Sequence, residues 1–251
     1  MVRSGDVRRL ATAGAMLLLV GSLGGCVETT QQKNARAQLQ DDRLLASRSG
    51  VQVTRRDPNV AVMNVRTLRS PAGGAIAVTL RNDGERPVSD LPVSVGVSTP
   101  AGRTTYLNRQ PELPYFQTHV AGIAGKAKAT WVFTSSRPLP SGRAFARVGP
   151  PAIPVDKAVN RLPAIALSVT SVRSRGRDRA TVSGRITNRS DAPQDGLEVY
   201  AYALSGDRIV AAGATLLESL GSGATQAVKV PLVGNPGSSA VRVETPPTNL
   251  R

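Results

Sequence analysis

Apolar and polar residues alternate along most of the chain after Val60, in short stretches rich in valine, threonine and isoleucine. In residues 75–80 the larger apolar side chains occupy every second position, which is the period of a strand with one buried face. Turn-forming residues separate the stretches, as in Asn-Asp-Gly at 82–84 and Ser-Gly-Asp at 205–207. No long amphipathic helix interrupts this region. The pattern predicts an all-β protein.

The same pattern occurs twice. A shift of 106 residues aligns core positions and turn positions together: Ile76 with Val182, Leu80 with Ile186, Asn82 with Asn188, Pro87 with Pro193, Leu91 with Leu197 and Val93 with Val199. Each copy ends before a double proline, at 150–151 and 246–247. We interpret the repeat as two tandem immunoglobulin-like β-sandwich domains, each with about six or seven strands.

The repeat sets the domain boundaries. We place the first sandwich at residues 59–151, a linker at 152–163, the second sandwich at 164–247 and a tail at 248–251. Residues 26–58 are polar, with leucine only at positions 39, 44 and 45. An apolar face this thin predicts a polar tether, partly helical, rather than part of a core.

The second copy carries a resemblance to a known family. Its four segments are a strand that reaches an asparagine turn (182–188), an aromatic-containing strand (197–202), a glycine hairpin (205–210) and a glycine turn (220–223). This order is similar to the FxLYD type of bacterial surface β-sandwich, over about 70 residues. The resemblance implies an accessory module of an exported protein, without a defined catalytic site.

The N-terminus has the form of a secretory signal. Basic residues at positions 3, 8 and 9 precede an apolar run at 10–20, which is short for a membrane span. The run closes on Leu23, Gly24, Gly25 and Cys26, which resembles the lipobox of bacterial lipoprotein signal peptides. The resemblance implies that Cys26 is diacylated and that residues 1–25 are removed. An ordinary secretory peptide and an uncleaved anchor are the alternatives, and all three place the rest of the chain outside the cytoplasm.

Composition narrows the chemistry. Cys26 is the only cysteine, so the chain after it has neither disulfides nor thiolate sites. Residues 1–25 hold three arginines and one aspartate, so residues 26–251 keep +13 of the formal +15. Outside the cell the abundant polyanions are phospholipid headgroups, wall polymers and polysaccharides, and we expect no nucleic-acid partner. Solubility alone is the other explanation of the charge.

Catalytic patterns are missing from the sequence. The one histidine, His119, has no Gly-x-Ser-x-Gly nucleophile elbow to serve and no evident carboxylate to orient its ring. We interpret it as a partly exposed strand residue. With no second histidine and no calcium-type carboxylate run, we predict no metal site, no cofactor and no catalytic residue.

Four arginines crowd one predicted hairpin tip: Arg173, Arg175, Arg177 and Arg179. Their planar guanidinium groups suit phosphate and carboxylate, so this tip is a candidate site for an anionic partner. The alternative is a solvated turn whose charges discourage pairing of strand edges.

Tyr200 and Tyr202 form a second candidate surface. If Leu197 and Val199 face the core, as their repeat partners do, the two tyrosines point the other way. We expect this face to contact a partner or the neighbouring domain, or to be covered by loops of the protein itself.

These inferences predict a non-enzymatic, lipid-anchored protein of a bacterial envelope, held at the cell membrane or the outer membrane through diacylglyceryl-Cys26. We expect it to bind or scaffold an envelope protein or an anionic polymer through its two sandwiches. The alternatives are a solute-binding or delivery lipoprotein of a transport system, which needs a deep cleft, and an envelope hydrolase, which needs a general base.

Overall fold

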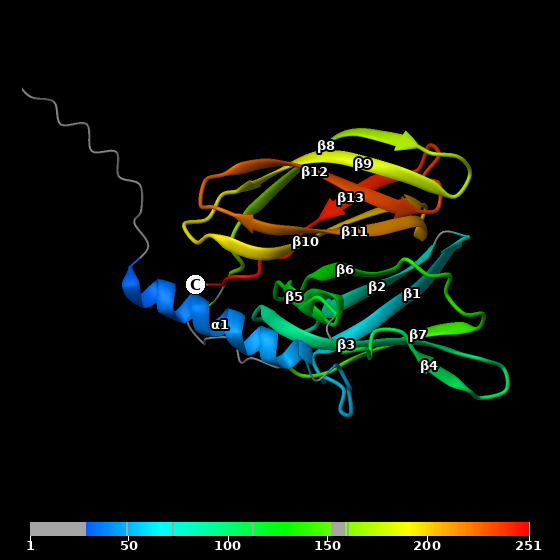
Figure 1. Ribbon diagram of the computed structural model, residues 1–251, viewed down its shortest axis with the longest axis horizontal. Helices are drawn as coiled ribbons and strands as arrows, with labels where there is room; N and C mark the ends of the chain where they lie inside the picture. The colour runs from blue at the N-terminus through cyan, green and yellow to red at the C-terminus, as the bar shows by residue number, and fades with distance from the viewer. Residues whose placement is uncertain are drawn as a thin grey trace, which may run out of the picture.

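The computed structural model describes residues 29–48, 50–71, 73–111, 113–151, 159 and 161–250. Within these ranges one α-helix precedes two groups of strands (Figure 1), so the predicted all-β sandwich class is confirmed. The first group contains β1 (Val60–Ser70), β2 (Gly73–Asn82), β3 (Val88–Ser98), β4 (Thr104–Tyr106), η1 (Tyr115–Gln117), β5 (His119–Ile123), β6 (Lys128–Ser135) and β7 (Arg143–Val148). The second contains β8 (Ile165–Ser174), β9 (Arg179–Asn188), β10 (Gln194–Ser205), β11 (Arg208–Leu220), β12 (Thr225–Val233) and β13 (Ala240–Glu244).

The first sandwich packs two antiparallel sheets face to face. One sheet has the order β1-β2-β6, and the other is built on β3, which pairs with β4, β5 and β7. Alternate residues of these strands are buried between the sheets, among them Ile76, Leu80, Leu91 and Val93. The period-two pattern of the sequence therefore forms this core.

The second sandwich is one curled sheet. Its order is β13-β10-β11-β12-β9-β8, but β11 and β12 are joined at a single residue pair, Ala212 with Val233. The sheet folds over at this weak join and brings β13 beside β8. Val182, Ile186, Leu197 and Val199 fill the space between the two halves.

The two sandwiches share a pairing pattern. β1-β2-β6 corresponds to β8-β9-β12, and the pairs of β3 with β5 and β7 correspond to those of β10 with β11 and β13. The repeated asparagine has the same role in both. Asn82 Nδ2 donates to Arg86 O at 2.8 Å and Asn188 Nδ2 donates to Ala192 O at 2.8 Å, four residues on in each case. Each asparagine thus replaces missing backbone partners in a turn.

The sandwiches lie against each other. Tyr200, Tyr202, Ile209 and Ala212 of the second sandwich belong to the same apolar cluster as Trp131 of the first. A polar link joins them as well, because Glu244 accepts hydrogen bonds from Tyr202 OH and, at 2.9 Å, from Thr130 N. A continuous apolar interface with this polar link favours a fixed arrangement of the two domains.

Helix α1 (Thr30–Arg48) begins at a capping box. Gln32 N donates to Thr29 Oγ1 at 3.3 Å, and Thr29 N donates to Gln32 Oε1 at 2.8 Å, so each residue satisfies a backbone donor of the other. Gly50 follows the helix with a φ of 65°, and a Cβ there would lie 2.8 Å from Arg109 O. The chain can make this turn only with glycine.

The structure alters our interpretation of the segments outside the sandwiches. Residues 26–58 include a helix docked on both sandwiches, and Val51 and Val53 are buried, so the stretch after residue 29 is not a free tether. The predicted tail is also anchored, because Thr248 and Asn249 are buried. Most of the proposed linker 152–163 lies outside the described residues.

Candidate functional site

One face of α1 holds the helix on the rest of the protein. Arg36, Gln40 and Arg43 are spaced four and three residues apart, so they lie in one row along the helix. Arg43 is 8% exposed and forms a two-point ion pair with Asp90, with Nε at 3.0 Å and Nη2 at 3.3 Å from its two oxygens. Because the helix has no broad apolar stripe, these polar contacts fix its position.

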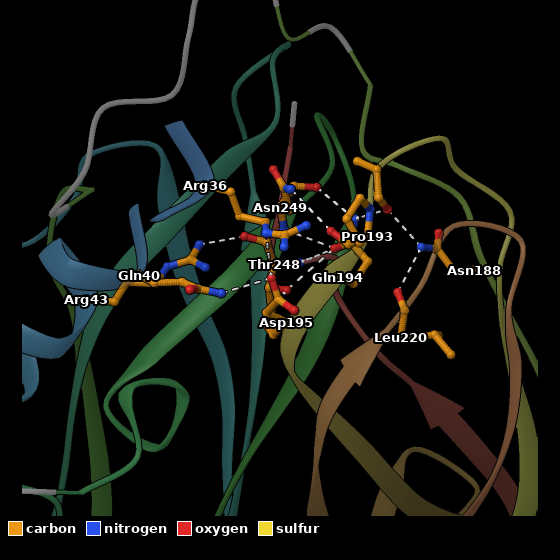
Figure 2. A network of polar contacts seen from close by, with 11 residues as sticks. Arg36, Gln40, Arg43, Asn188, Pro193, Gln194, Asp195, Leu220, Thr248 and Asn249 are labelled. Atoms are coloured by element: carbon orange, nitrogen blue, oxygen red, sulfur yellow. Dashed lines mark hydrogen bonds and ion pairs between the residues drawn. The ribbon is translucent and has the colours of Figure 1, made fainter. Parts of the chain in front are cut away.

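The same row reaches the second sandwich (Figure 2). Gln40 Nε2 donates to Asp195 Oδ2 at 2.9 Å, and Arg36 Nε lies 3.2 Å from the same oxygen. Arg43 Nη2 also donates to Thr248 O at 2.6 Å. We call Arg36, Gln40 and Arg43 with their partners Asp90, Asp195 and Thr248 the helix clasp, because they join α1 to both sandwiches.

A buried glutamine, Gln194, positions the Thr248 carbonyl that accepts a hydrogen bond from Arg43. Gln194 is fully buried, and its Oε1 accepts from Thr248 N at 2.8 Å and from Asn249 N at 2.9 Å, while its Nε2 donates to Asn249 O at 2.9 Å. These bonds hold the last described residues against the start of β10 (Figure 2). These bonds therefore hold the Thr248 carbonyl where Arg43 contacts it.

Aromatic side chains of the first sandwich pack against the Arg43 guanidinium. The Arg43 guanidinium lies 4.9 Å from the ring centroid of Phe116, a cation–π distance. Next to it Tyr115 stacks on His119, with ring centroids 3.9 Å apart. His119 is buried rather than partly exposed as predicted, and this burial lowers its pKa to about 4. Its ring is therefore neutral at physiological pH.

Cys26 and the lipobox residues Leu23, Gly24 and Gly25 lie outside the described residues. The arginine hairpin (residues 173–179) is fully exposed and joins β8 to β9. Arg175 N donates to Arg179 O at 2.7 Å, and Gly176 makes the turn with a φ of 75°. Its side chains are therefore accessible to a partner in solution.

Tyr200 and Tyr202 are not an external partner surface. Both point away from the core of their own sandwich, as predicted, but they are 1% and 3% exposed because the first sandwich covers them. Of the three predicted neighbours for this face, an external partner, the neighbouring domain or loops of the protein itself, the structure shows the neighbouring domain. The Tyr200 hydroxyl is buried without a hydrogen-bond partner.

The buried ionisable groups Arg43, Asp90 and Glu198 are absent from the sequence predictions. Glu198 lies on the tyrosine face of β10, and burial raises its pKa to about 7. The start of α1 was not predicted either, although Thr29 and Gln32 have the spacing of a capping box and were the local signal for it. Nothing local marked the Arg43–Asp90 pair, whose members are 47 residues apart.

No family model matches the chain, and no curated protein matches it. Among solved structures it is similar to the transglutaminase of red sea bream, at 10% identity and a TM-score of 0.23, over 88% of this chain and 32% of that one. The chain thus spans about a third of that protein's length.

Among the described residues, no helix combines the length and apolar character needed to cross a bilayer.

Proposed function

We propose that this protein is a non-catalytic lipoprotein of a bacterial envelope that presents two sandwiches in a fixed orientation on a membrane and binds anionic polymer through its arginine hairpin. The observation that carries the proposal is the helix clasp. The clasp binds α1, the helix that follows Cys26 in the sequence, to both folded domains.

The length of chain between the lipid site and the helix supports a close attachment. Thr30 follows Cys26 by four residues, and four extended residues span at most about 14 Å. A lipid on Cys26 would therefore hold the start of α1 near the headgroups. Because the clasp joins α1 to both sandwiches, the domains would share that orientation instead of moving on a loose tether.

The arginine hairpin lies at the opposite end of the molecule from the start of α1 (Figure 1). The clasp residue Asp195 is near the start of β10, and Leu204 near the other end of this strand pairs with Ala240. The loop between β12 and Ala240 contacts the hairpin, because Gly234 N donates to Asp178 O at 2.8 Å. Nine residues of strand separate these two ends by about 30 Å. The hairpin would face away from the anchoring membrane, which favours a polymer over headgroups of that membrane as its partner.

The test uses full-length protein in neutral phosphatidylcholine vesicles, with poly(glycerol phosphate) as the anionic polymer. Arg175→Ser with Arg177→Ser should weaken polymer binding about 30-fold at low salt, at roughly 1 kcal/mol per arginine. Added salt should weaken the wild type in the same way, because mobile ions screen the contacts.

Arg55→Ser with Arg56→Ser is the matched control, since it removes two exposed arginines from the segment that precedes β1. It should leave most of the affinity intact. Equal losses in the two double variants would mean that only net charge matters, and unchanged binding in the hairpin variant would show an ordinary surface turn. Either result would overturn the assignment of the hairpin.

A further inference from the structure

The first sandwich has an open side where two strand edges face each other without pairing. Among the described strands, β1 pairs only with β2 and β7 pairs only with β3, yet β1 and β7 lie side by side (Figure 1). A hollow of about 590 Å³ lies at this edge. The polar residues that line it are Asn64, Arg66, Thr67, Arg69 and Arg143.

Three arginines supply the charge of the hollow. Arg66 shares the inward face of β1 with the buried Leu68, and its Nε is buried without a hydrogen-bond partner. Arg69 also lines the hollow, and its Nη2 donates to Pro140 O at 2.9 Å and to Gly142 O at 3.4 Å, which fixes one end of that guanidinium. Arg143 is exposed at the start of β7.

No carboxylate neutralises this group within the part of the chain that the structure describes: the ion pairs there involve Arg36, Arg43, Arg81 and Lys126. A buried guanidinium nitrogen without a partner is costly, because it has lost water and gained nothing in return. Arg66 lines the hollow, and an oxyanion there would supply the counter-charge that this guanidinium lacks. The strand also bulges at Met63, where the register of β1 on β2 shifts, a feature found next to binding sites.

We propose that this hollow is a binding site for a small phosphate-bearing, hydroxylated ligand, such as a polyol phosphate or sugar phosphate unit. The guanidinium groups match the geometry of a phosphate group, and Asn64 and Thr67 offer partners for hydroxyls. The volume lies within the range of small-molecule sites, roughly 300 to 1,000 Å³. The site is separate from the arginine hairpin, which belongs to the other sandwich.

Isothermal titration of full-length protein in a nonionic detergent with glycerol 3-phosphate tests this proposal. We expect Arg143→Ser and Arg66→Gln each to weaken binding about tenfold or more, the loss typical of one charge-assisted contact. Arg103→Ser is the control, because it removes an exposed arginine from a loop of the same sandwich. It should keep the wild-type dissociation constant, and thermal unfolding should establish that each variant is folded.

Two further arms identify the ligand class and separate this proposal from the function of the hairpin. Glucuronate should bind more weakly than glycerol 3-phosphate, and the Arg175→Ser, Arg177→Ser variant should bind glycerol 3-phosphate like the wild type. No binding by the wild type at millimolar ligand would overturn the proposal, as would wild-type affinity in both Arg143→Ser and Arg66→Gln. Arg66 would then serve as an inward charge that keeps the edge of β1 from pairing. Preference for glucuronate would replace phosphate with carboxylate as the ligand class.

Discussion

The outer faces of β3 and β10 occupy equivalent positions in the two sandwiches but are covered in different ways. On β10, Tyr200 and Tyr202 are covered by the first sandwich. On β3 the equivalent residues are Ser94 and Gly96, which are covered by the segment that precedes β1 and by β7. Ser94 Oγ accepts from Val53 N at 3.2 Å, and a Cβ on Gly96 would lie 2.5 Å from Phe145 Cζ. The repeat thus keeps the core face of the strand and varies the outer face according to its neighbour.

The largest effect should come from emptying the interface on β10. Tyr200→Ala should lower the free energy of unfolding by about 3 to 5 kcal/mol, the usual cost of deleting a buried aromatic side chain. Its equivalent Ser94→Ala should cost about 1 kcal/mol, since it removes one hydrogen-bond acceptor. Denaturant unfolding measures both. Similar costs at the two positions would contradict our comparison of the two faces.

The second largest loss of stability should come from breaking the helix clasp. Arg43→Ala leaves Asp90 buried without its cation and should destabilise the protein by about 3 kcal/mol. Leu44→Ala is the matched control on the same helix, because Leu44 is 54% exposed and should change stability little. Hydrogen exchange should show faster exchange across α1 in Arg43→Ala alone. Unaltered protection of α1 would mean that the clasp does not hold the helix.

His119 in the first sandwich and Glu198 in the second are both buried with shifted pKa values, and the two shifts have opposite effects on stability. The pKa of His119 falls to about 4, so stability contributed by the neutral ring is lost as the pH falls from about 6.5 toward 4. The pKa of Glu198 rises to about 7, so stability contributed by the protonated acid is lost as the pH rises from about 4.5 toward 7. The two dependences oppose each other between about pH 4.5 and 6.5.

Substitution should separate these contributions. In Glu198→Gln the free energy of unfolding should rise with pH between 4 and 6.5, by up to about 1.4 kcal/mol per unit. In His119→Gln it should fall between 4.5 and 7. Urea unfolding at several pH values measures the slopes, and identical slopes in both variants and the wild type would show that neither group is shifted by burial.

The smallest effects separate the two tyrosines. Tyr202→Phe should cost about 2 kcal/mol, because Glu244 loses a hydrogen bond from the hydroxyl. Tyr200→Phe should be neutral or slightly stabilising, because it removes a buried hydroxyl that has no partner. Thermal unfolding of the two variants is a direct test. A larger loss of stability in Tyr200→Phe than in Tyr202→Phe would contradict the assignment of the buried hydrogen bond to Tyr202.

Local features of this fold could be predicted from the sequence, whereas contacts between distant segments could not. The alternation in residues 75–80 predicted the strands, and the matched Asn82 and Asn188 predicted equivalent turns, because both signals are local. Alternation also predicted that Tyr200 points outward, but it could not identify what covers that face, which depends on how the domains pack. Arg43 and Asp90 meet only through the tertiary fold, and a polar helix carries no apolar stripe to predict its docking. The hollow beside Arg66 likewise depends on the approach of β1 and β7.

The central proposal is attachment through Cys26, and mass spectrometry of the N-terminal peptide tests it most directly. The protein would be expressed in a bacterium and extracted from its membranes, with Cys26→Ala processed in parallel as the control. We predict a chain that begins at Cys26 with a diacylglyceryl group on its thiol, and a Cys26→Ala chain without lipid. A wild-type peptide that retains residues before Cys26, or a Cys26 that carries no lipid, would contradict the proposal.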